Sequence, residues 1–154
     1  MDLTEATRII NTVPDATLRK ALQQLQEANQ LLRSALSGDI VLHIDPETCE
    51  RTATDEAWTR TVNLVLKNSK GKVHDWCNLT FSTKASIADD SDAGTASIAS
   101  QNITFTNGKA SIVVSGDAED WLADETNTLT IASLTINGNT VTGGTSVETI
   151  VAAE

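Results

Sequence analysis

The chain has 154 residues, a formal net charge of −10 at pH 7 and 40% hydrophobic residues, but only 3% aromatic residues and no Tyr. This length suits one ordinary domain or a small domain with an appendage, and the apolar content is sufficient for a hydrophobic core. The acidity argues against a nucleic acid or an anionic membrane as partner. Because the chain has only two His besides its few aromatic residues, we expect a binding or structural protein without catalytic residues, a metal or another cofactor.

The composition changes at Gly38 and divides the chain into two segments. All eight Gly lie at or after this position, whereas four of the five Gln precede it. Residues 1–38 carry equal numbers of acidic and basic side chains, so the whole negative charge lies in residues 39–154. We therefore expect an N-terminal anchor and helical oligomerisation stem over residues 1–38, and a separate folded domain over residues 39–154.

Leucines of the first segment repeat at the spacing of a coiled coil. The repeat places Leu18, Leu25 and Leu32 at the d positions of a heptad and Leu22, Asn29 and Leu36 at the a positions. The g positions are Ala21, Ala28 and Ala35. Alanine at g broadens the apolar stripe and favours three or more helices, whereas a single Asn at an a position favours two. We expect a parallel homotrimer, with a dimer as the alternative.

The ends of this helix are marked by turn and capping residues. The sequence Thr12-Val13-Pro14-Asp15 resembles a capping box with Pro14 in the first turn, and Gly38 suits the left-handed conformation that ends a helix. The segment before the helix carries a small apolar set, namely Leu3, Ile9, Ile10 and Val13. These residues are too few for a core, so we expect them to dock into a groove of another protein; a frayed terminus is the alternative.

From Asp39 onward, apolar and polar residues alternate with the period of β-strands. The pattern predicts strands at Ile40–Ile44, Val62–Leu66, Val73–Phe81, Ile103–Phe105, Ala110–Val114, Leu129–Ile131, Leu134–Ile136 and Val147–Val151. Asn-Gly pairs at residues 107–108 and 137–138 predict tight hairpin turns. Residues 45–57 are expected to form a long loop, and residues 117–122 a short helical turn. The fold class predicted is mainly β: an immunoglobulin-like antiparallel β-sandwich preceded by an α-helical coiled-coil stem.

Few residues of the second segment have the chemistry of a catalytic or metal site. His43 and His74 fall within strand patterns that lack a nucleophile motif, which favours ordinary strand histidines. Zinc ligation by these histidines with Cys49 and Cys77 is disfavoured, because His74 and Cys77 are three residues apart on a predicted strand and point to opposite faces. Whether the two cysteines pair stays open, although free thiols are favoured without a secretory signal.

Two further features concern ligands. The run Asp89-Asp90-Ser91-Asp92-Ala93-Gly94 resembles part of a calcium-binding loop but lacks the distal Glu, so a solvated acidic loop is favoured. Trp76 and Trp121 are interpreted as anchors of the core. Trp58 follows a polar loop and is the best candidate for exposure. An exposed Trp at this place could stack on a sugar.

Six stretches of the second segment form a pattern of scaffold motifs: Thr61–Asn68, Gly71–Trp76, Gly94–Ile98, Gly116–Leu122, Thr128–Ile131 and Thr145–Thr149. Through them, residues 58–151 resemble the C-terminal domain of head fibre or capsid decoration proteins of tailed bacteriophages. The resemblance implies a virion surface protein, a trimer attached to the capsid by its N-terminal part. None of these motifs carries a catalytic residue.

We therefore expect a non-enzymatic bacteriophage virion structural protein, a trimeric head fibre or capsid decoration protein whose partner is the major capsid protein or another virion protein. The implied location is the capsid surface after synthesis in the host cytoplasm, with which the lack of a secretory leader agrees. The alternative is a receptor- or glycan-binding tail or adhesin module that binds a host-surface glycan. Head or tail location stays open, because a sandwich fold hosts many functions.

Overall fold

A computed structural model describes the backbone of residues 3–36 and 39–153, and the side chains of residues 4–29 and 39–153. The chain divides into two compact units, Met1–Gly38 and Asp39–Glu154, here called the helical unit and the C-terminal unit. The division falls where the composition changes. Among the described residues, no helix combines the length and apolar character needed to cross a membrane.

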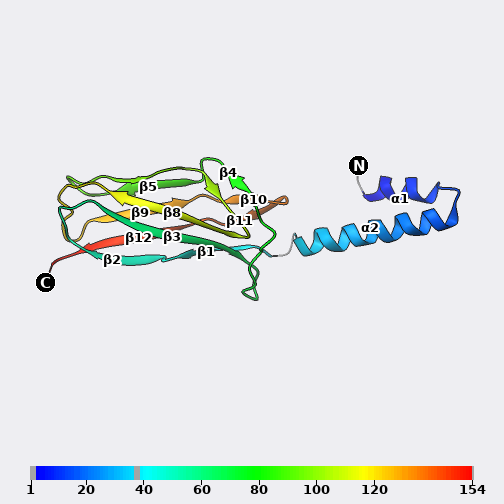
Figure 1. Cartoon of the computed structure of the whole chain (residues 1–154), viewed down its shortest axis with the longest axis horizontal. Helices are drawn as coiled ribbons and strands as arrows, with labels where there is room; N and C mark the ends of the chain where they lie inside the picture. Colours follow the sequence, from blue (N-terminus) through cyan, green and yellow to red (C-terminus); the bar gives the residue numbers. More distant parts are fainter. Residues whose placement is uncertain (1–2, 37–38, 154) are drawn as a thin grey trace. The chain divides into compact units, whose positions relative to one another are not determined.

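The helical unit contains two helices that pack against each other, α1 (Leu3–Asn11) and α2 (Ala16–Leu36) (Figure 1). A side-chain hydrogen bond joins them, because Gln23 Nε2 donates to Asn11 Oδ1 at 3.2 Å. The N-terminal segment is therefore mostly helical and has a packing partner within its own unit.

The N-terminus of α2 differs from the prediction, which placed a capping box at Thr12–Asp15 with Pro14 inside the first turn of the helix. Asp15 Oδ1 accepts a hydrogen bond from the Leu18 backbone N–H at 2.8 Å, so Asp15 is the N-cap. Pro14 precedes the cap and does not lie in the first turn as expected. Arg19 stabilises the turn before the helix, because its Nε and Nη2 donate to the Val13 carbonyl oxygen at 2.9 and 2.6 Å.

The C-terminal unit is mainly β and has two four-stranded sheets with two short ribbons (Figure 1). One sheet has the order β1 (Val41–Asp45), β3 (Trp58–Lys67), β8 (Lys109–Gly116), β6 (Ala96–Ile98). The other has the order β2 (Thr48–Thr52), β12 (Gly144–Val151), β9 (Thr126–Ile131), β5 (Ala85–Asp89). The ribbons pair β4 (Thr80–Phe81) with β7 (Ile103–Thr104), and β10 (Leu134–Ile136) with β11 (Asn139–Val141). Strand pairing is antiparallel except between β2 and β12.

The inward side chains of both sheets form the core of this unit. In β3, Val62, Leu64 and Leu66 are fully buried while the residues between them face outward. Leu129 and Ile131 of β9 enter the same core from the other sheet. Full burial of each such side chain stabilises the fold by about 1.5–3 kcal/mol, so the strict alternation fixes the register of these strands.

Both predicted Asn-Gly turns are confirmed. Asn107 and Gly108 have φ angles of 51° and 72°, and Asn137 and Gly138 have 51° and 80°. Two successive positive φ angles define the type I′ turn that matches the twist of a hairpin. A side chain at Gly108 would also lie 2.4 Å from the His74 carbonyl oxygen, so this position needs Gly for space as well as for conformation.

Three expectations of secondary structure are wrong. The expected long loop contains β2, whose inward residues are Cys49 and Arg51, so its sequence lacks the apolar alternation that marks a strand. Most of the expected strand at residues 73–81 is loop, and only β4 forms at its end. Residues 117–122 contain no helix; Trp121 forms a β-bridge with Thr54 instead.

The buried face of β12 carries two polar residues besides one apolar residue. In β12 the buried side chains are Ser146, Glu148 and Ile150, while Val147 and Val151 lie on the outer face. Burying Glu148 is unfavourable unless it has hydrogen-bonding or charged partners inside the unit.

Candidate functional site

The helical unit exposes large apolar side chains that nothing in the described part of the chain covers. Leu18 is 52% exposed, Leu25 59% and Ile9 44%. Ala21 and Ala28 are exposed as well. Since residues three and four apart share one side of a helix, Leu18, Ala21, Leu25 and Ala28 form one stripe on α2. We call these four residues the Leu/Ala face.

Helix α1 covers a different side of α2. Arg19, Leu22 and Gln26, again spaced by three and four, are partly buried. Gln26 Nε2 donates a hydrogen bond to Thr7 Oγ1 of α1 at 2.8 Å. The expected a/d seam is therefore divided, because its a position at Leu22 lies against α1 while the d and g positions point to solvent.

The remaining seam and anchor positions lie as follows. Asn29 is exposed, and the side chains of Leu32 and Leu36 lie outside the described residues. Ile10 and Val13 are partly buried, and the side chain of Leu3 lies outside the described residues. The expected anchor segment is thus largely helix α1, and Ile9 is its one large apolar side chain that is described as exposed.

The Leu/Ala face can be buried without removing a charge from water. Thr17 and Gln24, which border the face on its alanine side, are uncharged and exposed. Burial of a half-exposed Leu contributes about 1 kcal/mol, so one pair of helices would gain only a few kcal/mol. Association through this face therefore needs several leucines from several chains acting together.

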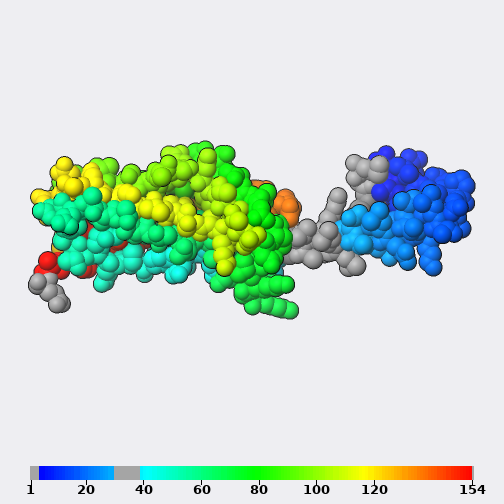
Figure 2. All heavy atoms as spheres, in the orientation of Figure 1, coloured from blue at the N-terminus to red at the C-terminus, as the bar shows by residue number. Residues whose placement is uncertain are grey.

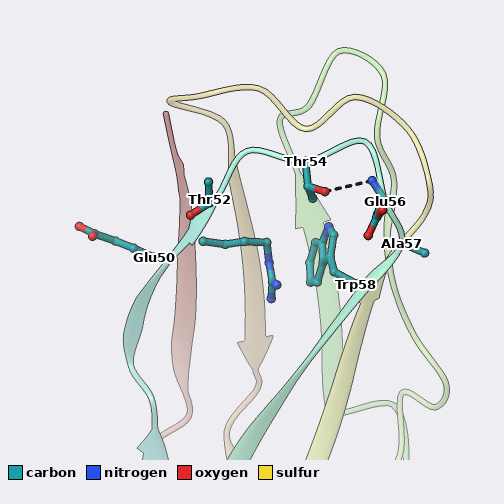
Figure 3. Close-up of a pocket in the computed structure, with 7 residues that line it drawn as sticks. Glu50, Thr52, Thr54, Glu56, Ala57 and Trp58 are labelled. Carbon is teal, nitrogen blue, oxygen red and sulfur yellow. Dashed lines mark hydrogen bonds between the residues drawn. The ribbon is translucent and has the colours of Figure 1, made fainter. Parts of the chain in front are cut away.

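A shallow pocket of about 460 Å³ lies between the end of β2 and the start of β3 (Figure 3). It is lined by Glu50, Arg51, Thr52, Thr54, Glu56, Ala57 and Trp58. The loop between the strands is stabilised by a hydrogen bond of 3.1 Å from the Glu56 backbone N–H to Thr54 Oγ1. Figure 3 shows the Glu50 side chain pointing away from Trp58. The lining is mostly polar.

The expected exposure of Trp58 is wrong, since its side chain belongs to the core and the residue is only 7% exposed. The Arg51 guanidinium lies 4.2 Å from the centre of the indole ring, a distance that allows a cation–π interaction. The Trp121 ring meets Trp58 edge to face at 5.2 Å between centroids. No face of Trp58 is thus left for a sugar to stack on in this conformation.

A buried polar cluster joins the two sheets next to Trp58. Arg60 of β3 donates from Nη1 to Ser146 Oγ at 2.7 Å and from Nη2 to Asn127 Oδ1 at 2.8 Å. Glu148 Oε2 accepts from Asn127 Nδ2 at 2.8 Å, and Glu148 Oε1 pairs with Arg51 Nη2 at 2.8 Å. The side chains of Arg60 and Glu148 are only 7% and 2% exposed. The cluster links strands of opposite sheets by charge-assisted hydrogen bonds.

Sequence reasoning missed this cluster, although its signal is present. Arg60 has the same parity along β3 as the buried Val62, and Glu148 has the same parity along β12 as Ile150. Two opposite charges at core positions of different strands predict a buried pair, because either alone would be unfavourable. Cys49 lies beside the cluster, where burial raises the pKa of its thiol.

The histidines occupy different environments. His43 is exposed on β1. His74 lies in the loop after β3, not in a strand as expected, and is buried. Its Nδ1 accepts from Trp76 Nε1 at 3.1 Å, which leaves Nε2 to donate to the Asp39 carbonyl oxygen at 3.1 Å. These contacts fix His74 as the neutral Nε2–H tautomer and attach Asp39 to the C-terminal unit.

The cysteines and the acidic run have structural partners. Cys49 and Cys77 are both free thiols. Asp89 Oδ2 accepts from the Ala96 backbone N–H at 2.9 Å. Asp90 accepts from the backbone and hydroxyl of Thr126. Within residues 3–36 and 39–153, no group of three or more His, Cys, Asp or Glu side chains is arranged to hold a metal ion.

Comparison with known proteins identifies no family for this chain. No protein-family model matches the chain, and no curated protein matches it. The solved structure of WR4, a C. elegans MSP family member, aligns with a TM-score of 0.34 and 13% sequence identity, covering 73% of this chain and 97% of that one. A likeness of this degree carries no argument about function.

Proposed function

We propose that the chain is a non-enzymatic structural protein of a tailed-bacteriophage virion, a trimeric head fibre or capsid decoration protein. The helical unit would form the oligomer and attach it to the capsid, and the C-terminal unit would be displayed as an immunoglobulin-like β-sandwich. The observation that carries the proposal is the exposed Leu/Ala face on a helical unit separate from the β-rich one. The resemblance of residues 58–151 to phage head proteins supports the virion location.

The division of the seam supports a specific arrangement of the oligomer. Because α1 covers the side of α2 that contains Leu22, the α2 helices would meet through the Leu/Ala face, with the α1 helices on the outside. Alternating Leu and Ala lets a small residue of one helix face a large residue of the next. Ile9, on the outer helix and 44% exposed, would then be available for the capsid. A dimer is the alternative arrangement.

The experiment is decoration of particles. Purified particles that lack the protein are incubated with the wild-type chain or with Ile9→Asp, and occupancy is measured by quantitative electron microscopy of C-terminally labelled protein. We expect the label on the head, and a loss of occupancy for Ile9→Asp. The matched control is Leu122→Asp, which places the same charge at a 54% exposed Leu of the C-terminal unit. Full occupancy by Ile9→Asp would contradict attachment through α1.

The second candidate function is a glycan-binding tail or adhesin module. The observation that favours it is the polar pocket beside Trp58, which lies at the end of the C-terminal unit opposite to Asp39. The burial of Trp58 weighs against it. Label on the tail, together with glycan-array binding that is lost in Thr54→Lys, would support this function over the first.

A further inference from the structure

The charged loops of the C-terminal unit are sorted between its two ends. One end carries the loops 53–57, 90–95 and 117–125, which lie together at one end in Figure 2 and contain no Lys or Arg. Their carboxylates are Asp55, Glu56, Asp90, Asp92, Asp117, Glu119, Asp120, Asp124 and Glu125. The opposite end carries every lysine of the unit: Lys67, Lys70, Lys72, Lys84 and Lys109. We call these the acidic end and the lysine end.

Strand register produces this separation. At the acidic end, β3 begins at Trp58, which pairs with Gly116; at the other end, Lys67 pairs with Val41. β3 has 10 residues, so the two ends are about 30 Å apart at about 3.3 Å per residue. The Debye length at physiological salt is only about 8 Å. Each end therefore acts by its own charge, and the net charge of the whole chain does not describe the lysine end.

Carboxylates at the lysine end are few. Asp39 and Asp75 are its acidic residues, against five lysines, so the local charge is positive. The Asp39 carboxylate is engaged, because it accepts a hydrogen bond from the Ser69 backbone N–H. Within the described residues, no ion pair involves any of the five lysines. The exclusion of anionic partners from total charge thus does not hold for this end.

Hydrogen bonds to Asn68 close the turn that carries two of these lysines. Asn68 Oδ1 accepts hydrogen bonds from the backbone N–H groups of Lys70 and Lys72 at 3.0 and 2.9 Å, and the Asn68 N–H donates to the Lys72 carbonyl at 2.9 Å. Lys67 and Lys109 lie on the outer face of the sheet next to Val65, since Lys67 is two residues further along β3 and Lys109 pairs with Val65 from β8. A backbone fixed in this way loses less conformational entropy on binding than a flexible loop, although the exposed lysine side chains themselves still have to be ordered.

We infer that the lysine end is a docking surface for a carboxylate-rich protein surface. All its cations are lysines, which are strongly hydrated point charges, whereas both arginines of the unit, Arg51 and Arg60, are turned to Glu148 in the interior. Arginine forks and exposed aromatic rings are what phosphate and single-stranded nucleic acids favour. The outer face next to the lysines offers instead uncharged residues such as Asn63 and Ser111.

The partner's identity rests on the proposed function. Asp39, where the chain enters from the helical unit, lies at the lysine end, bound to Ser69 and His74. On that function the partner is a carboxylate-rich surface of a virion protein.

The test uses poly-L-glutamate as the probe and the full-length ¹⁵N-labelled chain at low salt. We expect amide shift changes confined to residues 67–72, 84 and 109, with no change at residues 117–125, and weaker binding as salt rises. Lys70→Glu combined with Lys72→Glu should weaken binding about tenfold or more, because two attractions become repulsions. The matched control is Lys20→Glu on α2, for which the affinity should not change.

Three outcomes overturn the inference: no binding of poly-L-glutamate at low salt, shift changes centred elsewhere, or tighter binding of duplex DNA or of phosphatidylserine vesicles than of poly-L-glutamate. Circular dichroism of each variant checks folding, which the two exposed turn substitutions should not alter. Sedimentation of the same samples tests oligomer formation separately. A monomer that still binds poly-L-glutamate through its lysines would refute the proposed oligomer and leave this inference standing.

Discussion

The buried polar cluster predicts a large and specific loss of stability on Glu148→Gln. The substitution keeps the size of the side chain but removes the negative charge that faces Arg51 at 2.8 Å and Arg60 at 3.9 Å. Two guanidinium groups would then lie against the core without a counter-charge. Breaking a buried ion pair from one side destabilises proteins by about 3–5 kcal/mol. We expect a loss in that range for the full chain, because the Glu148 side chain is only 2% exposed.

The assay is equilibrium urea unfolding followed by tryptophan fluorescence, since Trp58 lies against the Arg51 guanidinium of the cluster. The matched control is Glu50→Gln, the same substitution at an exposed position of the neighbouring strand, which should change stability by less than about 0.5 kcal/mol. Equal and small losses for both variants would refute the reasoning and show that the cluster is energetically neutral. A double-mutant cycle with Arg60→Gln should give a coupling energy of about 0.5–3 kcal/mol.

Three further predictions follow from the C-terminal unit. Hydrogen bonds from the Thr126 backbone N–H, and then from its hydroxyl, lower the pKa of Asp90, so its stabilisation is present above about pH 4 and is lost as the pH falls through the lowered pKa. The Tm difference between wild type and Asp90→Asn should therefore shrink from pH 7 to pH 2.5, whereas Asp55→Asn should show little difference at either pH. Gly116→Ala should destabilise by about 1–3 kcal/mol in urea unfolding, because the new Cβ would lie 2.2 Å from the Trp58 ring. The C-terminal unit expressed alone should give a β-rich far-UV spectrum and sediment as a monomer; an unfolded spectrum would contradict its independence.

Local sequence patterns were sufficient to predict a strand and its buried face where that face is uniformly apolar. The alternation of Val62, Leu64 and Leu66 gave the C-terminal half and the facing of β3, and the Asn-Gly pairs gave two tight turns whose φ angles agree, one of them within the β10–β11 hairpin. These features depend on residues within a few positions of one another. Residue propensity and hydrophobic periodicity detect interactions over this short range of sequence.

The features that the sequence did not predict depend on contacts between residues that are far apart along the chain. β2 was missed because its inward side chains, Cys49 and Arg51, are stabilised by Glu148 about a hundred positions away. Trp58 was placed at the surface because nothing local signals Arg51 and Trp121 around it. For the same reason, the heptad pattern could not show that α1 would take the side of α2 around Leu22.

The predicted strand at residues 73–81 shows a different limit. Its apolar residues are buried or partly buried at Val73 and Cys77, but Leu79 is 41% exposed. The loop satisfies its polar groups through His74 and through the backbone contact of Cys77 with Gly108. Spacing alone does not distinguish such a loop from a strand.

Sedimentation equilibrium of the full chain at micromolar concentration tests the central claim most directly. The account predicts a mass three times that of the chain, and a monomer for Leu25→Asp, which places a charge in the middle of the Leu/Ala face where Leu25 is 59% exposed. Leu122→Asp, at a 54% exposed Leu of the C-terminal unit, should keep the trimer. A wild-type chain that sediments as a monomer, or a Leu25→Asp variant with unchanged mass, would contradict the account.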